Sequence, residues 1–165
     1  MGTSAKDLAR SEIEKLVNKW INSRGSDYTE QDTITNFILP FLRTLGWDIY
    51  NVYEVKQGGY PINFRRAVPV ENRSLKNPDC IISINDKPHI VFEFKRLTDG
   101  GHVDRYPQRK ENLLEKVRYV NAKYGVLTNF VETVVYDANG KELAKFKSPK
   151  EYIDRFDDLW TYLAK

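Results

Sequence analysis

A chain of 165 residues is long enough to bury a substantial hydrophobic core and is most simply a single domain. Its composition, with 41% hydrophobic and 30% charged residues, is that of a globular protein and excludes wholesale disorder. No apolar run approaches the roughly 20 residues that span a bilayer, and the first residues lack the apolar core of a signal peptide. We therefore expect a cytoplasmic protein. The single cysteine, Cys80, excludes an intrachain disulfide and a cysteine-based zinc cluster.

The net charge of +3 is small, but its distribution along the chain is uneven. Residues 1–55 carry more acidic than basic side chains, whereas residues 56–76 sum to +4 and residues 95–110 sum to +3. The two basic segments flank an apolar stretch with interspersed charges at 77–96. This arrangement suggests a polyanion bound nearby, although solvated basic loops explain it equally well.

The first third of the chain predicts two helices. Residues 4–23 carry apolar side chains at helical spacing, and the pattern stops at a glycine-containing turn. A second helix is expected from about residue 30 to 45, with Thr29 as its N-cap and Asp32 completing a capping box. Pro40 lies inside this helix and should kink it, because proline removes one backbone hydrogen bond.

The rest of the chain predicts strands with two further helices. Residues 47–57 are β-branched and aromatic and indicate a strand, and residues 57–76 indicate a long irregular loop. A hairpin at 77–96, a loop, a helix at 108–122, a strand at 124–129, a hairpin turning at Asn139-Gly140 and a helix from Pro149, with Ser148 as N-cap, follow in order. This order predicts an α/β domain with a central mixed β-sheet flanked by α-helices.

The register of the 77–96 hairpin decides where its charges lie. Glu93 and Lys95 share a face because side chains alternate along a strand. A two-residue loop at 86–87 would send Asp79 to the opposite face, whereas a three-residue loop at 85–87 pairs Asp79 with Glu93. The apolar pattern favours the three-residue loop, because a buried, unpaired carboxylate is avoided. One face then holds Cys80, Ile82, Ile84, Ile90, Phe92 and Phe94, and the other holds Ile81, Ser83, His89 and Val91.

In this register Asp79, Glu93 and Lys95 gather at one end of one face. Two close carboxylates repel each other unless a cation lies between them or one is protonated. Hard cations such as Mg²⁺ prefer oxygen ligands, and the backbone carbonyl of Phe94 is a natural third ligand. A lysine beside the metal could orient an attacking water for metal-assisted phosphodiester hydrolysis. The alternative is an ordinary charge pair of Glu93 with Lys95 at the end of a sheet.

These residues resemble a known signature. Pro78-Asp79, thirteen residues and then Glu93-Phe94-Lys95 is similar to the PD-(D/E)XK nuclease motif. The stretch "TEQDTITNFILPFLRTLGWDIYNV" resembles the leading helix and strand of the N-terminal endonuclease domain of type I restriction enzyme R subunits and type IIG restriction–modification enzymes. "VFEFKR", "YVNAKYGVLTNFVETVVYD" and "YIDRFDDLWTYL" resemble later parts of that domain in the same order. The similarity covers residues 28–163.

The resemblance implies a restriction-endonuclease-like fold and assigns roles to the matching residues. Asp79 and Glu93 would bind the metal with the Phe94 carbonyl, and Lys95 would be the catalytic lysine. Glu30 would be a catalytic acid on the leading helix that supports the metal directly or through water. A glutamate in the first turn of a helix is also favoured by the helix dipole, without any metal. The cofactor would be Mg²⁺, with Mn²⁺ as a substitute.

The family often carries a Gln-x-x-x-Tyr motif after the lysine strand. The matching positions here are Glu115 and Tyr119, so the glutamine is replaced. Gln108 lies nearby but has no tyrosine four residues later. The residues expected to contact DNA are Lys56, Arg65, Arg66, Arg73, Lys76, Arg96, Arg105, Arg109 and Tyr119.

The sequence thus predicts one nuclease domain over residues 1–165, with an N-terminal helix at 1–25 and the core at 28–163. Its function would be Mg²⁺-dependent endonuclease cleavage of double-stranded DNA, as the cleavage domain of a restriction–modification enzyme. Methyltransferase, specificity or translocase domains would be its partners, and dimerisation would allow double-strand cleavage. The alternatives are a catalytically silent nucleic-acid-binding or assembly domain, or a repair or junction nuclease of the same fold.

Overall fold

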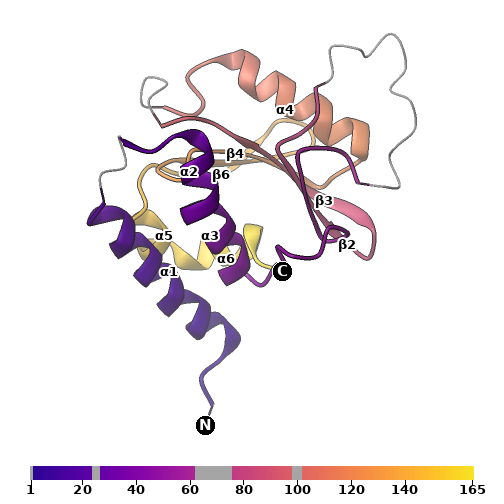
Figure 1. Ribbon diagram of the computed structural model, residues 1–165. Coiled ribbons are helices and arrows are strands. Elements are labelled where there is room, and N and C mark those ends of the chain that lie inside the picture. The colour runs from indigo at the N-terminus through magenta and orange to yellow at the C-terminus, as the bar shows by residue number, and fades with distance from the viewer. Residues whose placement is uncertain (1, 24–26, 62–75, 98–101) are drawn as a thin grey trace.

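The computed structural model describes residues 2–23, 27–61, 76–97 and 102–165. Its elements follow the predicted order of two helical segments, three strands, one helix, three strands and a helical C-terminus. Helices and strands pack as layers, with the sheet between α4 and the remaining helices (Figure 1). Helix and strand bounds are α1 Ala5–Ile21, α2 Glu30–Thr33, π-helix η2 Ile34–Ile38, α3 Leu39–Thr44, β1 Val55–Gln57, β2 Cys80–Ile84, β3 Lys87–Phe94, α4 Pro107–Val120, β4 Tyr124–Thr128, β5 Thr133–Asp137, β6 Glu142–Phe146, α5 Glu151–Asp154 and α6 Phe156–Leu163.

The six strands of the described chain form one mixed sheet in sequence order, β1 to β6. Neighbouring strands are antiparallel except β3 and β4, which are parallel. Parallel neighbours need a long crossover connection, and α4 supplies it between β3 and β4. The predicted mixed α/β architecture is confirmed.

The turn of the β2–β3 hairpin differs from the prediction. Ile84 pairs with Lys87, so the loop contains two residues, Asn85 and Asp86. Both loop residues have positive φ, 51° and 64°, as a tight hairpin turn whose twist matches the strands requires. The predicted three-residue loop is therefore wrong, and Ile84 is exposed rather than part of the core face.

A β-bulge restores the predicted register beyond this turn. The pairing shifts between Ile82 and Ser83, so that one extra residue, His89, is accommodated in β3. Beyond the bulge Cys80 lies opposite Phe92, as the apolar pattern predicted. Continuing this register by one residue brings the positions of the two acids opposite each other.

The bulge also moves His89 to the other face of the sheet. Its ring lies 6.2 Å from that of Trp47 and 5.6 Å from that of Tyr124, both on the side of α1, α3 and α6. The expectation that His89 shares a face with the acids is therefore wrong, because it assumed an unbroken alternation of side chains.

Each face of the sheet has its own hydrophobic core. On one face α1, η2, α3, α5 and α6 pack on apolar side chains of β1 to β6, with Phe37, Trp47, Phe92 and Phe130 among the largest. On the other face α4 packs Leu113, Leu114, Val117 and Val120 on Ile81, Val91, Leu127 and Val134. The predicted division between two faces is thus confirmed for Cys80, Ile82, Ile90, Phe92 and Phe94 on one face and for Ile81 and Val91 on the other.

The helical segment from residue 30 to 44 begins as predicted. The Thr29 hydroxyl accepts the Asp32 backbone N–H, and the Asp32 carboxylate accepts that of Thr29, which completes a capping box. The segment contains the π-helix η2, which ends at Ile38, two residues before Pro40. Because proline has no N–H, the Asn36 carbonyl loses its α-helical partner, and Lys19 Nζ donates to it at 3.4 Å.

Two other predicted elements are shorter than expected. Strand β1 starts only at Val55, because Asp48 and Asn51 form local turns whose side chains accept the N–H groups of Tyr50 and Tyr53. The C-terminal helix starts at Glu151 rather than at residue 149 and is interrupted at Arg155. In the described parts of the chain, none of the helices combines the length and apolar character needed to cross a membrane.

Candidate active site

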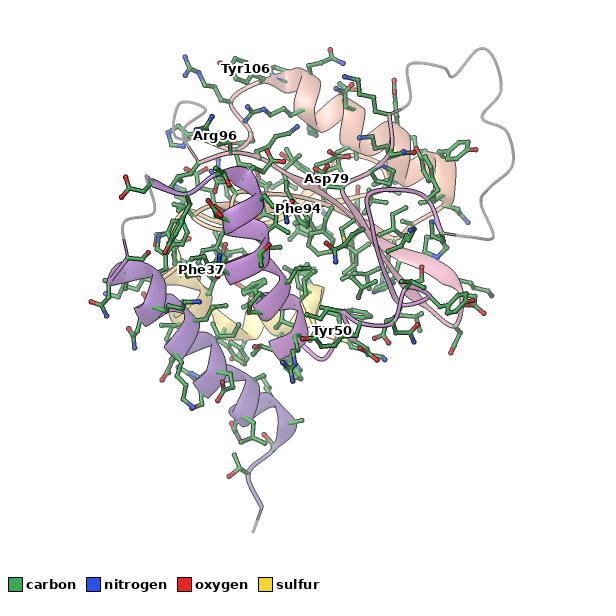
Figure 2. All side chains as sticks on the ribbon, in the orientation of Figure 1. Phe37, Tyr50, Asp79, Phe94, Arg96 and Tyr106 are labelled. Carbon is green, nitrogen blue, oxygen red and sulfur yellow. The ribbon has the colours of Figure 1, made fainter. Side chains whose placement is uncertain are left out.

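The two acids of the hairpin lie close together at one end of β2 and β3. Asp79 directly precedes β2, and its Oδ2 accepts the backbone N–H of Phe94 at 2.7 Å. Figure 2 shows Asp79 and Phe94 next to each other below α4. Asp79 also interacts with the Glu93 carboxyl group through charge and a side-chain hydrogen bond. The prediction that the two carboxyl groups are neighbours is confirmed.

The environment of Glu93 favours its protonated form. The side chain is buried, with 6% of its surface exposed, and burial raises the pKa of Glu93 to about 7. The Asp79 carboxylate contributes to this rise of the pKa, and Lys116 opposes it. A carboxyl group with a pKa near neutrality between a second acid and a lysine is typical of a functional site.

Lys116 forms a buried ion pair with Glu93. Its Nζ donates to Glu93 Oε1, and only 6% of the Lys116 surface is exposed. Helix α4 places Lys116 over β3, between the apolar residues Leu113 and Val117 that fasten the helix to the sheet. Lys116 thereby supplies a positive charge that offsets one of the two neighbouring carboxylates.

The backbone N–H groups of Phe94 and Lys95 point to opposite neighbours of β3. The N–H of Lys95 donates to the Thr128 carbonyl at 2.9 Å, toward β4, and the N–H of Phe94 donates to Asp79, toward β2. Because the N–H and C=O of one strand residue point to the same side, the Phe94 carbonyl also faces Asp79. The Lys95 side chain is half-buried and has no ion-pair partner among the described residues.

A cavity of about 280 Å³ joins these residues to the start of α2. Glu30, the first residue of α2, lines it together with the two hairpin acids and Lys95. The structure therefore brings all four residues of the predicted catalytic set to one cavity. The other lining residues are Lys76, Asn77, Phe94, Arg109, Asn112 and Lys116.

The donor set of this cavity fits Mg²⁺ in kind. No group of three or more His, Cys, Asp or Glu side chains close enough to hold a metal occurs in the described ranges, so Glu30 does not complete such a cluster. Asp79 and Glu93 nevertheless offer hard carboxylate oxygens, and the Phe94 carbonyl faces the same side. Mg²⁺ binds through one or two carboxylates and retains several waters, so two acids and a carbonyl are sufficient.

The predicted DNA-contacting residues are distributed unevenly. Lys76 and Arg109 line the cavity, whereas Arg96 and Arg105 are exposed outside its lining (Figure 2 labels Arg96). Lys56 is half-buried on β1 and does not line the cavity. Three further predicted contacts lie outside the described residues, namely Arg65, Arg66 and Arg73.

The positions matched to the Gln-x-x-x-Tyr motif do not line the cavity. Glu115 is exposed, and the half-buried Tyr119 packs edge-on against Tyr60 with ring centroids 5.1 Å apart. Two residues four positions apart, Asn112 and Lys116, instead point from α4 into the cavity. Helix α4 therefore presents two residues four positions apart to the cavity, three positions before those matched to the motif.

Sequence reasoning did not select Lys116 or Asn112. A usable signal existed for the lysine, because residues 113, 116, 117 and 120 recur at helical spacing and form the buried stripe of α4. A lysine on such a stripe requires a buried acid as its partner. Glu93 is that acid.

The segment before α4 is fixed to the sheet by the buried Glu132. Its carboxylate contacts His102 Nδ1 at 2.9 Å and accepts the Val103 N–H at 3.3 Å. Arg109 in turn donates to the Val103 carbonyl at 3.1 Å. These contacts position the first turn of α4, and with it Arg109, at the edge of the cavity.

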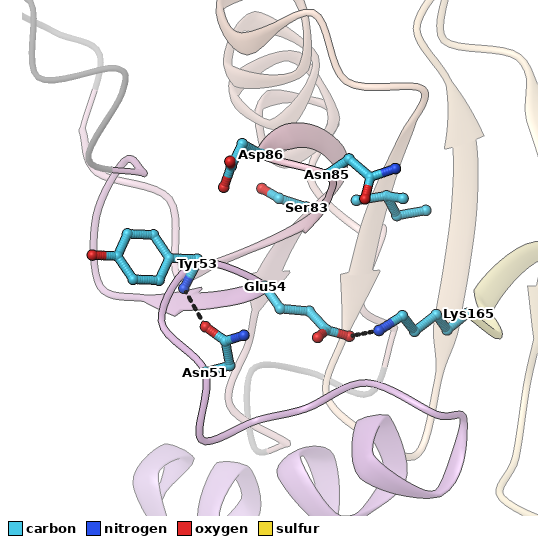
Figure 3. A pocket seen from close by; sticks show the side chains of 8 residues that line it. Asn51, Tyr53, Glu54, Ser83, Asn85, Asp86 and Lys165 are labelled. Carbon is cyan, nitrogen blue, oxygen red and sulfur yellow. Dashed lines mark hydrogen bonds and ion pairs between the residues drawn. The ribbon is translucent and has the colours of Figure 1, made fainter.

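A second cavity of about 240 Å³ lies at the turn end of the same hairpin (Figure 3). In its wall Glu54 Oε1 forms an ion pair with Lys165 Nζ at 2.7 Å, and the Tyr53 N–H donates to Asn51 Oδ1. None of the predicted catalytic residues lines it. The residues around it are Asn51, Tyr53, Glu54, Ser83, Ile84, Asn85, Asp86 and Lys165.

The fold is a mixed α/β domain with two neighbouring acids in a cavity, and comparisons with known proteins give its relationship. Residues 62–143 match the family model of the type I restriction enzyme R protein N terminus. The chain is also 25% identical over 172 aligned positions to the type II restriction enzyme and methyltransferase RM.Eco57I of Escherichia coli. That alignment covers 91% of this chain but only 16% of the relative. No solved structure matches the chain.

These two matches confirm the resemblance that the sequence motifs indicated. They support a restriction-enzyme nuclease-like domain similar to the N terminus of type I restriction enzyme R proteins. It spans about a sixth of the length of the curated relative it matches.

Proposed function

We propose that this domain is a Mg²⁺-dependent DNA endonuclease with a restriction-endonuclease-like fold, the cleavage domain of a restriction–modification enzyme. The observation that carries the proposal is the single cavity lined by Asp79, Glu93, Lys95 and Glu30. The family relationship supports DNA as the substrate and a restriction enzyme as the context. The hairpin that bears the acids, followed by a crossover helix and a parallel strand, supports the fold assignment.

The acids and the lysine would divide the chemistry between them. Asp79, held by the Phe94 N–H, and Glu93 are the carboxylates that would hold Mg²⁺ with the Phe94 carbonyl. When bound, Mg²⁺ supplies Lewis-acid activation of water and of the phosphate. The Lys95 ammonium, which has no ion-pair partner among the described residues, would orient the attacking water or neutralise charge developing on the phosphate oxygens.

Basic residues around the cavity would position the DNA backbone. Lys76 and Arg109 line the cavity and can contact phosphates on either side of the scissile bond. The exposed Arg96 and Arg105 would extend this contact along the duplex. Such contacts carry no base information, so target recognition would come from other domains or subunits, such as a specificity, methyltransferase or translocase component. Cleavage of both strands would require a second active site, supplied by dimerisation.

The decisive experiment compares supercoiled plasmid nicking by the wild-type chain and Lys95→Ala, with Mg²⁺ or Mn²⁺. We expect nicking by the wild type and a loss of at least 100-fold in Lys95→Ala. Lys87→Ala is the matched control, because Lys87 lies on the same strand at its exposed far end and should behave as wild type. Equal nicking by wild type and Lys95→Ala would exclude the proposed site. DNA binding without nicking under both metals would favour the silent DNA-binding domain.

A further inference from the structure

The candidate site contains one more buried cation than metal-assisted hydrolysis requires. Lys95 already supplies the ammonium group that the proposed chemistry uses. Lys116 is nevertheless buried against Glu93, and no part of its role follows from that chemistry. Its helical neighbours Leu113 and Val117 are fully buried and apolar. An ordinary helix–sheet contact would place an apolar side chain there, since a well-packed apolar residue is often at least as stabilising as a buried ion pair.

The charges around Glu93 explain what this lysine does. Asp79 and Glu93 contact each other, and two ionised carboxylates at such a distance destabilise the folded chain unless a cation offsets them. Lys116 Nζ contacts Glu93 Oε1 directly, so it occupies one oxygen of the carboxylate pair. Lys116 thereby offsets part of the negative charge of the two acids.

We propose that Lys116 is a positioning residue that acts as a built-in counter-cation: it holds Glu93 beside Asp79 in the metal-free protein and lowers the affinity of the site for a divalent cation. This inference rests on the proposed metal-dependent function. A cation that approaches the two carboxylates meets the positive charge of Lys116 within the same buried environment, where charge interactions are screened less than at the surface. Metal binding to the DNA-free domain is therefore weak, and folding does not depend on metal.

The test measures Mg²⁺ binding, without DNA, by isothermal titration calorimetry at pH 8.5, above the pKa of about 7 that Glu93 has in the wild type. The wild type is compared with Lys116→Met, which retains the length of the side chain but removes its charge. We expect Lys116→Met to bind Mg²⁺ at least tenfold more tightly than the wild type. Lys116→Arg, which keeps the charge, should bind as weakly as the wild type. Equal or weaker Mg²⁺ binding by Lys116→Met would overturn the proposal.

A second readout separates this role from a purely structural ion pair. Without metal, Lys116→Met should melt about 5–15 °C below the wild type, because it leaves a buried carboxylate pair without its cation. Saturating Mg²⁺ should raise the Tm of Lys116→Met more than that of the wild type, since the metal replaces the lost charge. A merely structural role predicts the same loss of Tm with no extra effect of Mg²⁺, and that result would contradict the proposal.

The double variant Glu93→Gln/Lys116→Met guards against a folding failure. It lacks both members of the ion pair, so it should recover stability relative to Lys116→Met and show no tight Mg²⁺ binding. Tight binding by the double variant would place the metal elsewhere and overturn the inference. Plasmid nicking by the wild type remains a separate measurement. Persistent nicking with unchanged Mg²⁺ affinity in Lys116→Met would reject the role of Lys116 while leaving the nuclease function intact.

Discussion

The Asp79 carboxylate accepts the backbone N–H of Phe94 at an N···O distance of 2.7 Å. This bond fixes the side chain that precedes β2 to the last residue of β3, at the point where the ladder between the two strands ends. The same carboxylate lies against Glu93 and raises the pKa of that residue. Asp79 is thus held in a position where its negative charge disfavours ionisation of Glu93.

Asp79→Asn should therefore be more stable than the wild type in the absence of metal, by about 1 kcal/mol. The amide oxygen can still accept the Phe94 N–H, but the repulsion with Glu93 is gone. The same variant should lose plasmid nicking, because a neutral amide is a poor ligand for Mg²⁺. Urea unfolding with EDTA measures the first effect. A variant less stable than the wild type would show that the hydrogen bond, and not the repulsion, dominates at this position.

The raised pKa of Glu93 predicts a specific dependence of stability on pH. An acid whose pKa is about 7 in the folded chain and 4.5 when unfolded stabilises the fold fully below 4.5, and loses this contribution as pH rises through 7. The free energy of unfolding of the wild type minus that of Glu93→Gln should therefore fall between pH 4.5 and 8, by about 3 kcal/mol at most.

Taking the difference between the two proteins cancels the titration of the other carboxyl groups. The measurement is urea unfolding at several pH values with EDTA present. A difference that stays constant between pH 5 and 8 would contradict the raised pKa. Under the proposed function, plasmid nicking should also increase as the pH rises through 7, because only the ionised Glu93 can hold the metal.

The close approach of α4 to β4 depends on Gly125. A Cβ atom there would lie 2.8 Å from Val117 Cγ2 and 3.0 Å from Leu113 Cγ. Gly125→Ala should therefore push α4 outward and destabilise the chain by about 1–3 kcal/mol. Lys116 lies on the same face of α4 as Leu113 and Val117, so the shift of the helix should also weaken its contact with Glu93. Gly59→Ala is the matched control, since its added Cβ would meet nothing closer than 4.0 Å.

Thermal unfolding of the two alanine variants measures the effect of the added methyl groups. The Gly125→Ala chain should melt several degrees below the wild type, whereas Gly59→Ala should stay close to it. Equal melting temperatures for both variants would mean that α4 moves away from the sheet without energetic consequence. The close approach of α4 to Gly125 would then not contribute to stability.

The sequence predicted the parts of this structure that depend on local patterns. Alternation of apolar residues gave the right pairing of Cys80 with Phe92 although the turn was wrong, because the bulge at His89 compensates for the shorter loop. Alternation constrains a whole strand, whereas the number of residues in a turn is a local choice that a single bulge can offset.

Features that depend on distant partners were not predictable in the same way. Lys116 lies 23 positions from Glu93 in the sequence, and a lysine in a helix ordinarily indicates a solvated position. Strand β1 was overextended because Asp48 and Asn51 bind neighbouring backbone N–H groups in turns, which the β-propensity of the surrounding aromatics conceals. Long-range ion pairs and competing local hydrogen bonds are both invisible to periodicity.

Glu30 allows a further test of the proposed site, because it lines the cavity from α2, which is distant in sequence from the hairpin. It is the exposed first residue of α2, behind the capping box of Thr29 and Asp32 that fixes the start of the helix. Glu30→Gln should change the free energy of unfolding by less than about 1 kcal/mol, the usual size of a charge–dipole interaction at an exposed helix terminus. If Glu30 supports the metal through water as proposed, plasmid nicking should fall at least tenfold at limiting Mg²⁺ and recover partly at high Mg²⁺. Gln31→Ala, one residue further along α2 and outside the cavity lining, is the control and should nick DNA as the wild type does. Unchanged nicking by Glu30→Gln over the whole Mg²⁺ range would show that Glu30 does not support the metal.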